Sequence, residues 1–229
     1  MKNHILQIER KLRTIKKVLL KDSALQNDID FSFDFIPPFS KADSISNVKL
    51  VIIGQDPTIQ DKKESTKKRQ KEITITLDLN NENGNLRRYC KLICENLGIN
   101  LDKEVYATNL CKCVFKEKPA YNGVLDKHSK QWIPLLKNEL SIFSEKVIFI
   151  TLGEPLLSQL MHTNSKKVNY YWDYIGKTKS GGNFKCNEPF ENYLKKRIYP
   201  IAHQPTWSLQ KFYKTYLKEY LEFVKRNEK

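Results

Sequence analysis

The sequence lacks the long apolar runs and the phosphate-binding loop that would assign it to two large classes of protein. No apolar run approaches the ~20 residues of a membrane-spanning helix, and no apolar segment follows the first lysines as in a secretory signal. No glycine-rich phosphate loop and no paired metal-binding carboxylates occur, which argues against a nucleotide- or phosphoester-hydrolysing enzyme. We therefore expect a protein that is not secreted, does not enter a membrane, and resides in the cytoplasm or wherever its substrate is found.

Cysteines with metal-binding spacing are lacking too. The chain has five cysteines, and the pairs Cys90/Cys94 and Cys111/Cys113 do not have the spacing of a zinc knuckle or ribbon. An odd number of cysteines without such spacing is typical of reduced thiols. We therefore predict no metal site and no disulfide framework.

Acidic residues are scarce relative to basic ones. The chain has 40 Lys and Arg against 26 Asp and Glu, a formal net charge of +14, and a pI near 9.4. The positive field that follows favours polyanionic partners. A lysine-rich genome that raises lysine content on every surface is the alternative, so charge alone does not establish the partner.

Four short runs of apolar residues predict buried strands. The runs cover 48–53, 105–108, 146–151 and 197–202. Helical spacing of apolar residues separates them over 86–97 and 132–142. Because strands that alternate with helices form mainly parallel sheets, we expect an α/β fold in one domain over residues 1–229.

Amphipathic helices are predicted near both ends of the chain. The first covers about 4–22 and the second covers 209–224, each with one broad apolar face. An organelle presequence is the alternative for the first helix. Glu9 and Asp22 interrupt its basic character, which favours a helix that packs on the core.

Each predicted strand ends in a turn that carries polar residues or glycine. These turns are 54–58 (Gly-Gln-Asp-Pro-Thr), 108–110 (Thr-Asn-Leu), 152–155 (Leu-Gly-Glu-Pro) and 203–208 (His-Gln-Pro-Thr-Trp-Ser). Ligands bind beyond the carboxyl ends of parallel strands, so Asp56 and His203 are candidate chemical groups. A plain Asp-Pro turn is the alternative for Asp56. His203 differs from the other histidines because it directly follows a predicted strand.

Two of these turns resemble motifs of a known family. Residues 47–57, Asn-Val-Lys-Leu-Val-Ile-Ile-Gly-Gln-Asp-Pro, resemble the first motif of the uracil-DNA glycosylase superfamily, nearest to the branch with the Gly-Gln-Asp-Pro motif, and 203–208 resemble the last motif. The resemblance extends from about Phe35 to about Phe212. It implies a three-layer α/β/α sandwich on a four-stranded parallel sheet, and hydrolysis of an N-glycosidic bond in DNA. It implies no metal or cofactor, and no iron–sulfur cluster, since relatives with a cluster use N-terminal cysteines that are absent here.

The resemblance also implies roles for the residues at the strand ends. Asp56 would orient the attacking water and stabilise the positively charged sugar, while neutral His203 would donate a hydrogen bond to the pyrimidine O2. Asn109 matches the family's base-reading asparagine. The amide of that residue complements uracil and thymine but not cytosine. An asparagine that merely closes a turn is the alternative for Asn109.

Contacts with DNA follow from the same resemblance. We expect a monomer that binds single- or double-stranded DNA and flips the target nucleotide into its pocket. Trp207 matches the apolar wedge that fills the vacated space, although packing beneath the last helix is an equal alternative. The remaining residues assigned to the base or to the DNA backbone are Gln55, Gly153, Pro205 and Ser208.

The sequence departs from the family pattern at several positions. Thr58 stands where uracil-specific enzymes have a tyrosine that blocks a 5-methyl group, and Ile75 stands where the family has a base-stacking phenylalanine. Glu154 replaces a small serine, and 163–196 is a long segment that we interpret as a surface insertion without regular elements. We predict a monofunctional glycosylase that removes uracil or a 5-substituted pyrimidine and leaves an abasic site. The alternative is a non-catalytic DNA-binding or replication-associated protein on the same scaffold.

Overall fold

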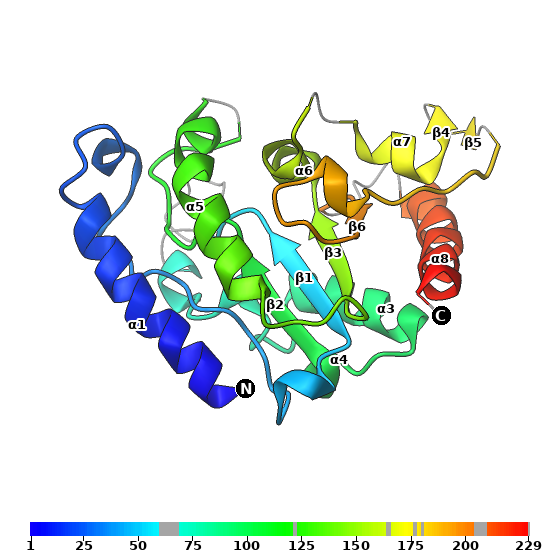
Figure 1. The fold of residues 1–229 in the computed structure, drawn as a ribbon, viewed down its shortest axis with the longest axis horizontal. Helices are drawn as coiled ribbons and strands as arrows, with labels where there is room; N and C mark the ends of the chain where they lie inside the picture. The colour runs from blue at the N-terminus through cyan, green and yellow to red at the C-terminus, as the bar shows by residue number, and fades with distance from the viewer. Residues whose placement is uncertain are drawn as a thin grey trace.

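A four-stranded parallel sheet forms the centre of the protein (Figure 1). The computed structural model describes residues 1–59, 69–120, 123–163, 166–175, 178–179, 181–203 and 210–228. The strands are β1 (Leu50–Gly54), β2 (Val105–Asn109), β3 (Ile148–Leu152) and β6 (Ile198–Ile201), and they lie in the order β2-β1-β3-β6. All three neighbouring pairs are parallel, so every strand delivers its carboxyl end to the same edge.

The strands form where the sequence is continuously apolar, because both faces of the sheet are covered. All residues of β1 and β2 are buried. Pro200 lies in β6, an edge strand of the sheet, where one side of the backbone needs no donor. The predicted strands and the parallel sheet are confirmed, with boundaries that differ by one or two residues.

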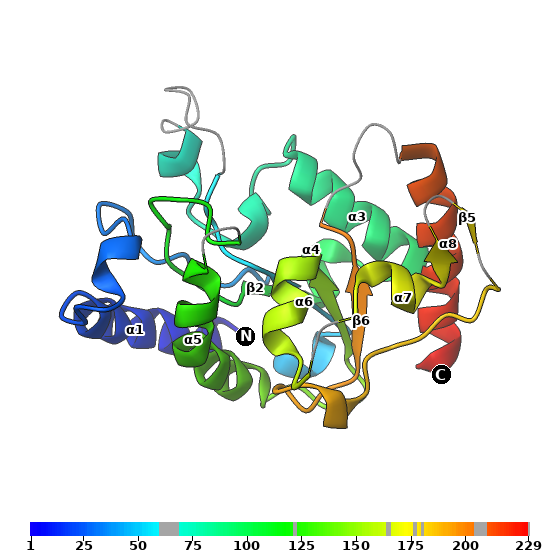
Figure 2. The same cartoon turned by 90° about the horizontal axis from the view of Figure 1, so that it is seen from above.

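Helices cover both faces and complete a three-layer α/β/α sandwich (Figure 2). Alternate residues of β1 divide between two cores: Leu50 and Ile52 face the core formed with α3 (Asn85–Leu97) and α8 (Gln210–Asn227). Val51 and Ile53 face the core formed with α1 (Lys2–Leu19) and α5 (Val124–Leu140). The smaller helices are α4 (Leu101–Glu104), α6 (Glu154–Leu160) and α7 (Val168–Trp172).

Helix α5 begins earlier than the expected range of 132–142. It starts at Val124, after Gly123 in a left-handed conformation with φ 65. The first turns carry His128 and Ser129 at buried positions, which are usually apolar in an amphipathic helix. The apolar spacing therefore reveals only the second half of this helix.

The expectation that 163–196 contains no regular elements is wrong. This segment includes α7, the hairpin of β4 (Tyr174–Ile175) and β5 (Thr178–Lys179), and a 3-10 helix at Pro189–Glu191. Trp172 fixes it to the core, since its Nε1 donates to Pro200 O at 2.8 Å and its ring stacks on Tyr220 at 5.2 Å. In Figure 1 α7, β4 and β5 lie toward the end of the sheet where the strands terminate, whereas the following chain returns to the amino end of β6, where Asn187 pairs with Ile198.

No helix within the described ranges combines the length and the apolar character needed to cross a membrane.

Candidate active site

The turns that follow β1 and β2 remain paired beyond the sheet. Leu110 N donates to Gly54 O at 2.8 Å, and Cys111 N donates to Gln55 O at 2.9 Å. Farther along, the amide of Phe115 donates to Thr58 Oγ1 at 2.9 Å. These bonds hold the turn at 54–58 against the loop that follows Asn109, so residues far apart in the sequence share one edge of the sheet.

Asp56 lies in the first of these turns with its carboxylate held on both oxygens. Thr58 N donates to Oδ1 at 2.8 Å and Gln55 Nε2 donates to Oδ2 at 2.7 Å. Burial raises the pKa of Asp56 above its ordinary value, and the bonds from Thr58 and Gln55 act in the opposite direction. A carboxylate that is oriented yet poorly solvated is suited to accept a proton from water. The structure thus places Gln55 and Thr58 as partners of Asp56.

Gln70 supports the same turn and was not found by sequence reasoning. It is buried, donates from Nε2 to Pro57 O at 3.0 Å, and accepts from Ile59 N at 2.7 Å. The amide side chain thereby replaces backbone pairing on both sides of Thr58. No motif marks such a glutamine, because the two segments meet only through the fold.

Asn109 ends β2 and is fully buried. Among the described residues neither its Nδ2 nor its Oδ1 has a hydrogen-bond partner. An unsatisfied buried polar group costs about 1–3 kcal/mol, so such a group calls for a ligand or water. Because this side chain bonds to nothing in its own turn, the turn-closing alternative for Asn109 is not what the structure shows.

Gly54 makes room for the Asn109 amide. A Cβ atom built on Gly54 would overlap Asn109 Oδ1 and would lie 2.8 Å from Leu77 Cδ2. A larger residue at this position would therefore displace the asparagine or the leucine. The glycine of the first motif is explained by this close approach, not by a special backbone conformation.

Leu77 is the second residue that sequence reasoning missed. Its φ of 57 and the φ of 52 at Asp78 are left-handed values that are uncommon outside glycine. This backbone is stabilised by Thr76, whose N and Oγ1 both donate to Pro37 O, at 3.1 and 2.9 Å. The Leu77 side chain lies at Gly54 and Asn109, whereas Ile75 is half-buried and packs against the core formed with α3 and α8. An aliphatic side chain therefore borders the Asn109 amide.

His203 follows β6 and keeps an exposed side chain. The surrounding protein nevertheless removes part of its hydration, which lowers the pKa of His203 and favours the neutral ring. A Cβ atom on Gly153 would lie 3.3 Å from His203 Cβ, so the turn after β3 lies against this histidine. Gly153 has φ 99, a conformation that requires glycine.

The strand order sets the spacing between the two candidate groups. Asp56 follows β1 and His203 follows β6, with β3 between them. Neighbouring strands lie about 4.8 Å apart, so the two turns start about 10 Å apart. The turn after β3 lies between them, with Gly153 against His203. Pro205, Trp207 and Ser208 lie outside the described residues.

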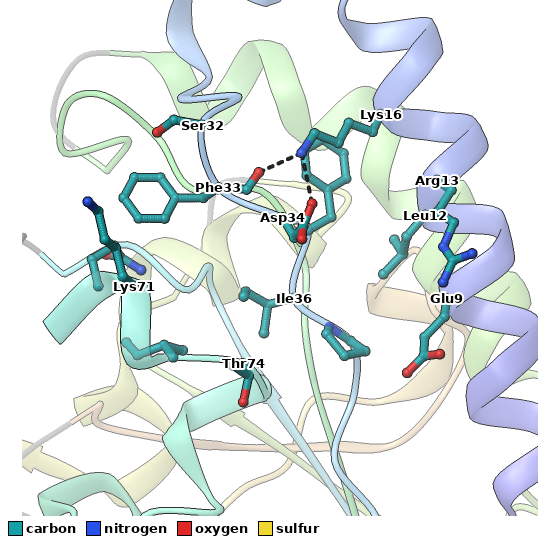
Figure 3. A pocket seen from close by; sticks show the side chains of 14 residues that line it. Glu9, Leu12, Arg13, Lys16, Ser32, Phe33, Asp34, Ile36, Lys71 and Thr74 are labelled. Atoms are coloured by element: carbon teal, nitrogen blue, oxygen red, sulfur yellow. Dashed lines mark hydrogen bonds and ion pairs between the residues drawn. The ribbon is translucent and has the colours of Figure 1, made fainter. Parts of the chain in front are cut away.

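A hollow of about 530 Å³ lies beside this edge but is not lined by Asp56, Asn109 or His203 (Figure 3). Its walls come from α1, from 32–37 and from 70–74. Lys16 reaches into it and donates to Phe33 O at 2.8 Å and to Asp34 Oδ1 at 3.1 Å. The hollow is therefore separate from the strand-end groups. In the described part of the chain, no three His, Cys, Asp or Glu residues are grouped to hold a metal.

A parallel sheet that gathers a carboxylate, an unpartnered amide and an imidazole at its carboxyl edge is typical of α/β enzymes. The sequence model of the Uracil DNA glycosylase superfamily matches residues 41–225. The chain belongs to that superfamily, and membership points to a DNA glycosylase, a hydrolase of DNA repair. The match begins after the expected Phe35 and continues beyond Phe212 through most of α8. A comparison with curated proteins found no match.

Proposed function

We propose that this protein is a monofunctional DNA glycosylase that hydrolyses the N-glycosidic bond of a flipped-out pyrimidine and leaves an abasic site. The observation that carries the proposal is the fully buried Asn109 amide, which has no partner among the described residues. A base that supplies both a donor and an acceptor would satisfy it. Uracil and thymine do so, because Oδ1 accepts from N3–H while Nδ2 donates to O4. Cytosine presents the reverse pattern and would leave both groups unsatisfied in the amide orientation that the structure has.

The two flanking groups match the charges that develop as the bond breaks. The sugar becomes positive and the departing base becomes negative, so opposite charges are needed on opposite sides. Asp56 stabilises the sugar and accepts a proton from the water whose oxygen bonds to C1′. Neutral His203 donates a hydrogen bond to O2 of the leaving base. Its lowered pKa supports this neutral role.

Extrusion of a nucleotide from a duplex costs a few kcal/mol, which contacts with the DNA must offset. The net charge of +14 supports binding to the phosphate backbone. By the family resemblance, Gly153, Pro205 and Ser208 contact that backbone and Trp207 acts as the wedge. We propose that a monomer carries out these steps, in the cytoplasm or in whichever compartment holds the DNA.

The base pocket accepts substituents at C5 under this proposal. Thr58 is smaller than the tyrosine of uracil-specific relatives, and its hydroxyl is occupied by Phe115 N at 2.9 Å. Leu77 offers an aliphatic contact that does not require one particular ring. Uracil and 5-substituted pyrimidines are therefore the proposed substrates.

The test is excision from matched duplexes that carry uracil, mispaired thymine, bulky 5-substituted pyrimidines or cytosine. Wild type is compared with Asp56→Asn and His203→Ala, and abasic sites are detected by alkaline cleavage. Release of a pyrimidine other than cytosine, lost in Asp56→Asn, supports the proposal. Binding of all duplexes without any abasic site would instead favour the non-catalytic DNA-binding function, which the departures from the family pattern at Thr58 and Ile75 motivate.

A further inference from the structure

A buried ion pair lies directly behind Asn109. Lys112 Nζ is 2.9 Å from Glu139 Oε2, and the two side chains are only 3% and 4% exposed. Lys112 comes from the loop after β2 and Glu139 comes from α5. The chemistry proposed above uses neither residue.

Every polar group of this pair is satisfied. Besides Glu139, the Lys112 ammonium donates to Thr108 Oγ1 at 2.6 Å and to Asn109 O at 2.5 Å, which uses all three of its protons. Glu139 Oε1 accepts from Tyr106 OH at 2.9 Å and from Thr108 Oγ1 at 2.6 Å. The network thus links three residues of β2 to α5.

Stability does not explain why these charges are buried. Removing two ions from water costs so much free energy that apolar residues of similar volume are often equally stabilising. The direction of the pair is informative instead. Glu139 contacts positions 106 and 108, whereas Lys112 contacts the carbonyl of Asn109 at the end of the strand. The positive end therefore points toward the edge where the site lies.

We propose that Lys112 and Glu139 form a positioning pair that fixes the Asn109 backbone so that its amide faces the base. Asn109 needs such support because its own side chain bonds to no described residue. The positive end of the pair also lies on the side where the leaving base gains negative charge. This inference rests on the proposed function, and it adds residues that contact no substrate.

The test uses the double variant Lys112→Met/Glu139→Gln. The two changes together leave no unpaired buried charge, and the glutamine keeps an acceptor for Tyr106 and Thr108. Leu136→Ala is the matched control, because Leu136 is 1% exposed on the same helix and its truncation lowers stability while both charges of the pair remain.

Affinity is measured for duplexes with 2′-fluoro-2′-deoxyuridine or 2′-fluoro-2′-deoxycytidine, in which the fluorine opposes cleavage. Wild type should bind the uridine duplex more tightly. In the double variant, the ratio of the affinities for the uridine and cytidine duplexes should fall about tenfold, a typical coupling between residues in contact. Leu136→Ala should keep the preference. In excision of ordinary deoxyuridine, the double change should add little to the loss caused by Asn109→Ala.

Two outcomes would overturn the inference: a double variant that keeps the wild-type preference, or a wild type that shows none. If the wild type prefers the uridine duplex and the double variant loses that preference, but no base is excised, the glycosylase proposal is refuted and the positioning pair remains supported. The failures of the two proposals are therefore distinguishable.

Discussion

Two asparagines on either side of β2 experience opposite environments. Asn100 caps α4, the short helix that leads into β2, is exposed, and accepts from Asp102 N at 3.0 Å through its side chain. Asn109 ends the strand, is fully buried, and has no side-chain partner among the described residues. The same residue type thus caps a helix before the strand and, in the proposed function, receives the base at its end.

The two ends of the sheet also differ in how well their polar groups and backbone are accommodated. At the amino end, Glu104 receives Lys49 Nζ and Asn100 N on its two oxygens, and its pKa is lowered chiefly by the bond from Lys49. At the carboxyl end, Leu77 is strained and Asp56 has a raised pKa because it is buried. Groups whose surroundings cost stability thus lie at the end where the site is assembled, whereas the opposite end carries satisfied surface contacts.

The largest effect is expected from Asp56→Asn. The carboxylate is the group that we assign to the water and to the positive sugar, so its neutral replacement should slow excision by about 10³-fold. Single-turnover excision of the best pyrimidine substrate measures this loss. The fold should persist, because an amide retains an acceptor for Thr58 N. A variant with near wild-type rates would remove Asp56 from the mechanism.

Gly54→Ala should have the next largest effect. The added methyl group would overlap Asn109 Oδ1 and Leu77 Cδ2, so we expect a loss of about 10²-fold in excision and of about 1–3 kcal/mol in stability. Gly98→Ala is the control, because nothing lies within 4 Å of its added atom but its φ of 73 is strained for alanine. That control should lose about 1 kcal/mol of stability and no activity. Equal activity losses in both variants would contradict the role of Gly54.

The pH dependence of stability gives a smaller effect. Because folding raises the pKa of Asp56, its contribution to the free energy of unfolding is greatest below the ordinary value of 3.8 and is lost as pH rises through the folded pKa. Asp56→Asn should therefore gain stability relative to wild type between about pH 4 and pH 7. Urea unfolding at several pH values measures the difference. If the stability advantage of Asp56→Asn over wild type falls as pH rises, the hydrogen bonds to the carboxylate affect its pKa more than burial does.

The fold was largely predictable because its strands are continuously apolar and their ends carry distinctive turns. The placement of Asp56, Asn109 and His203 at one edge follows from parallel topology once four strands are recognised. The Lys112–Glu139 pair was not predictable, since a charged residue in a sequence usually indicates a surface. Leu77 was not predictable either, because a left-handed leucine depends on the bonds that Thr76 makes to Pro37.

The smallest effect is expected at the amino end of the sheet, from Lys49→Met. Lys49 is 62% exposed in its side chain and pairs with Glu104 across the starts of β1 and β2. Solvent-exposed ion pairs contribute about 0–1 kcal/mol, so removal of this one should change stability by less than about 1 kcal/mol. Excision should remain at the wild-type rate, because the change lies a full strand length from Asp56 and Asn109. Thermal unfolding and single-turnover excision, measured on the same preparation, test both statements. A marked loss of activity without a loss of stability would mean that the amino end is coupled to the site, and that the division between a stabilising end and a reactive end does not hold.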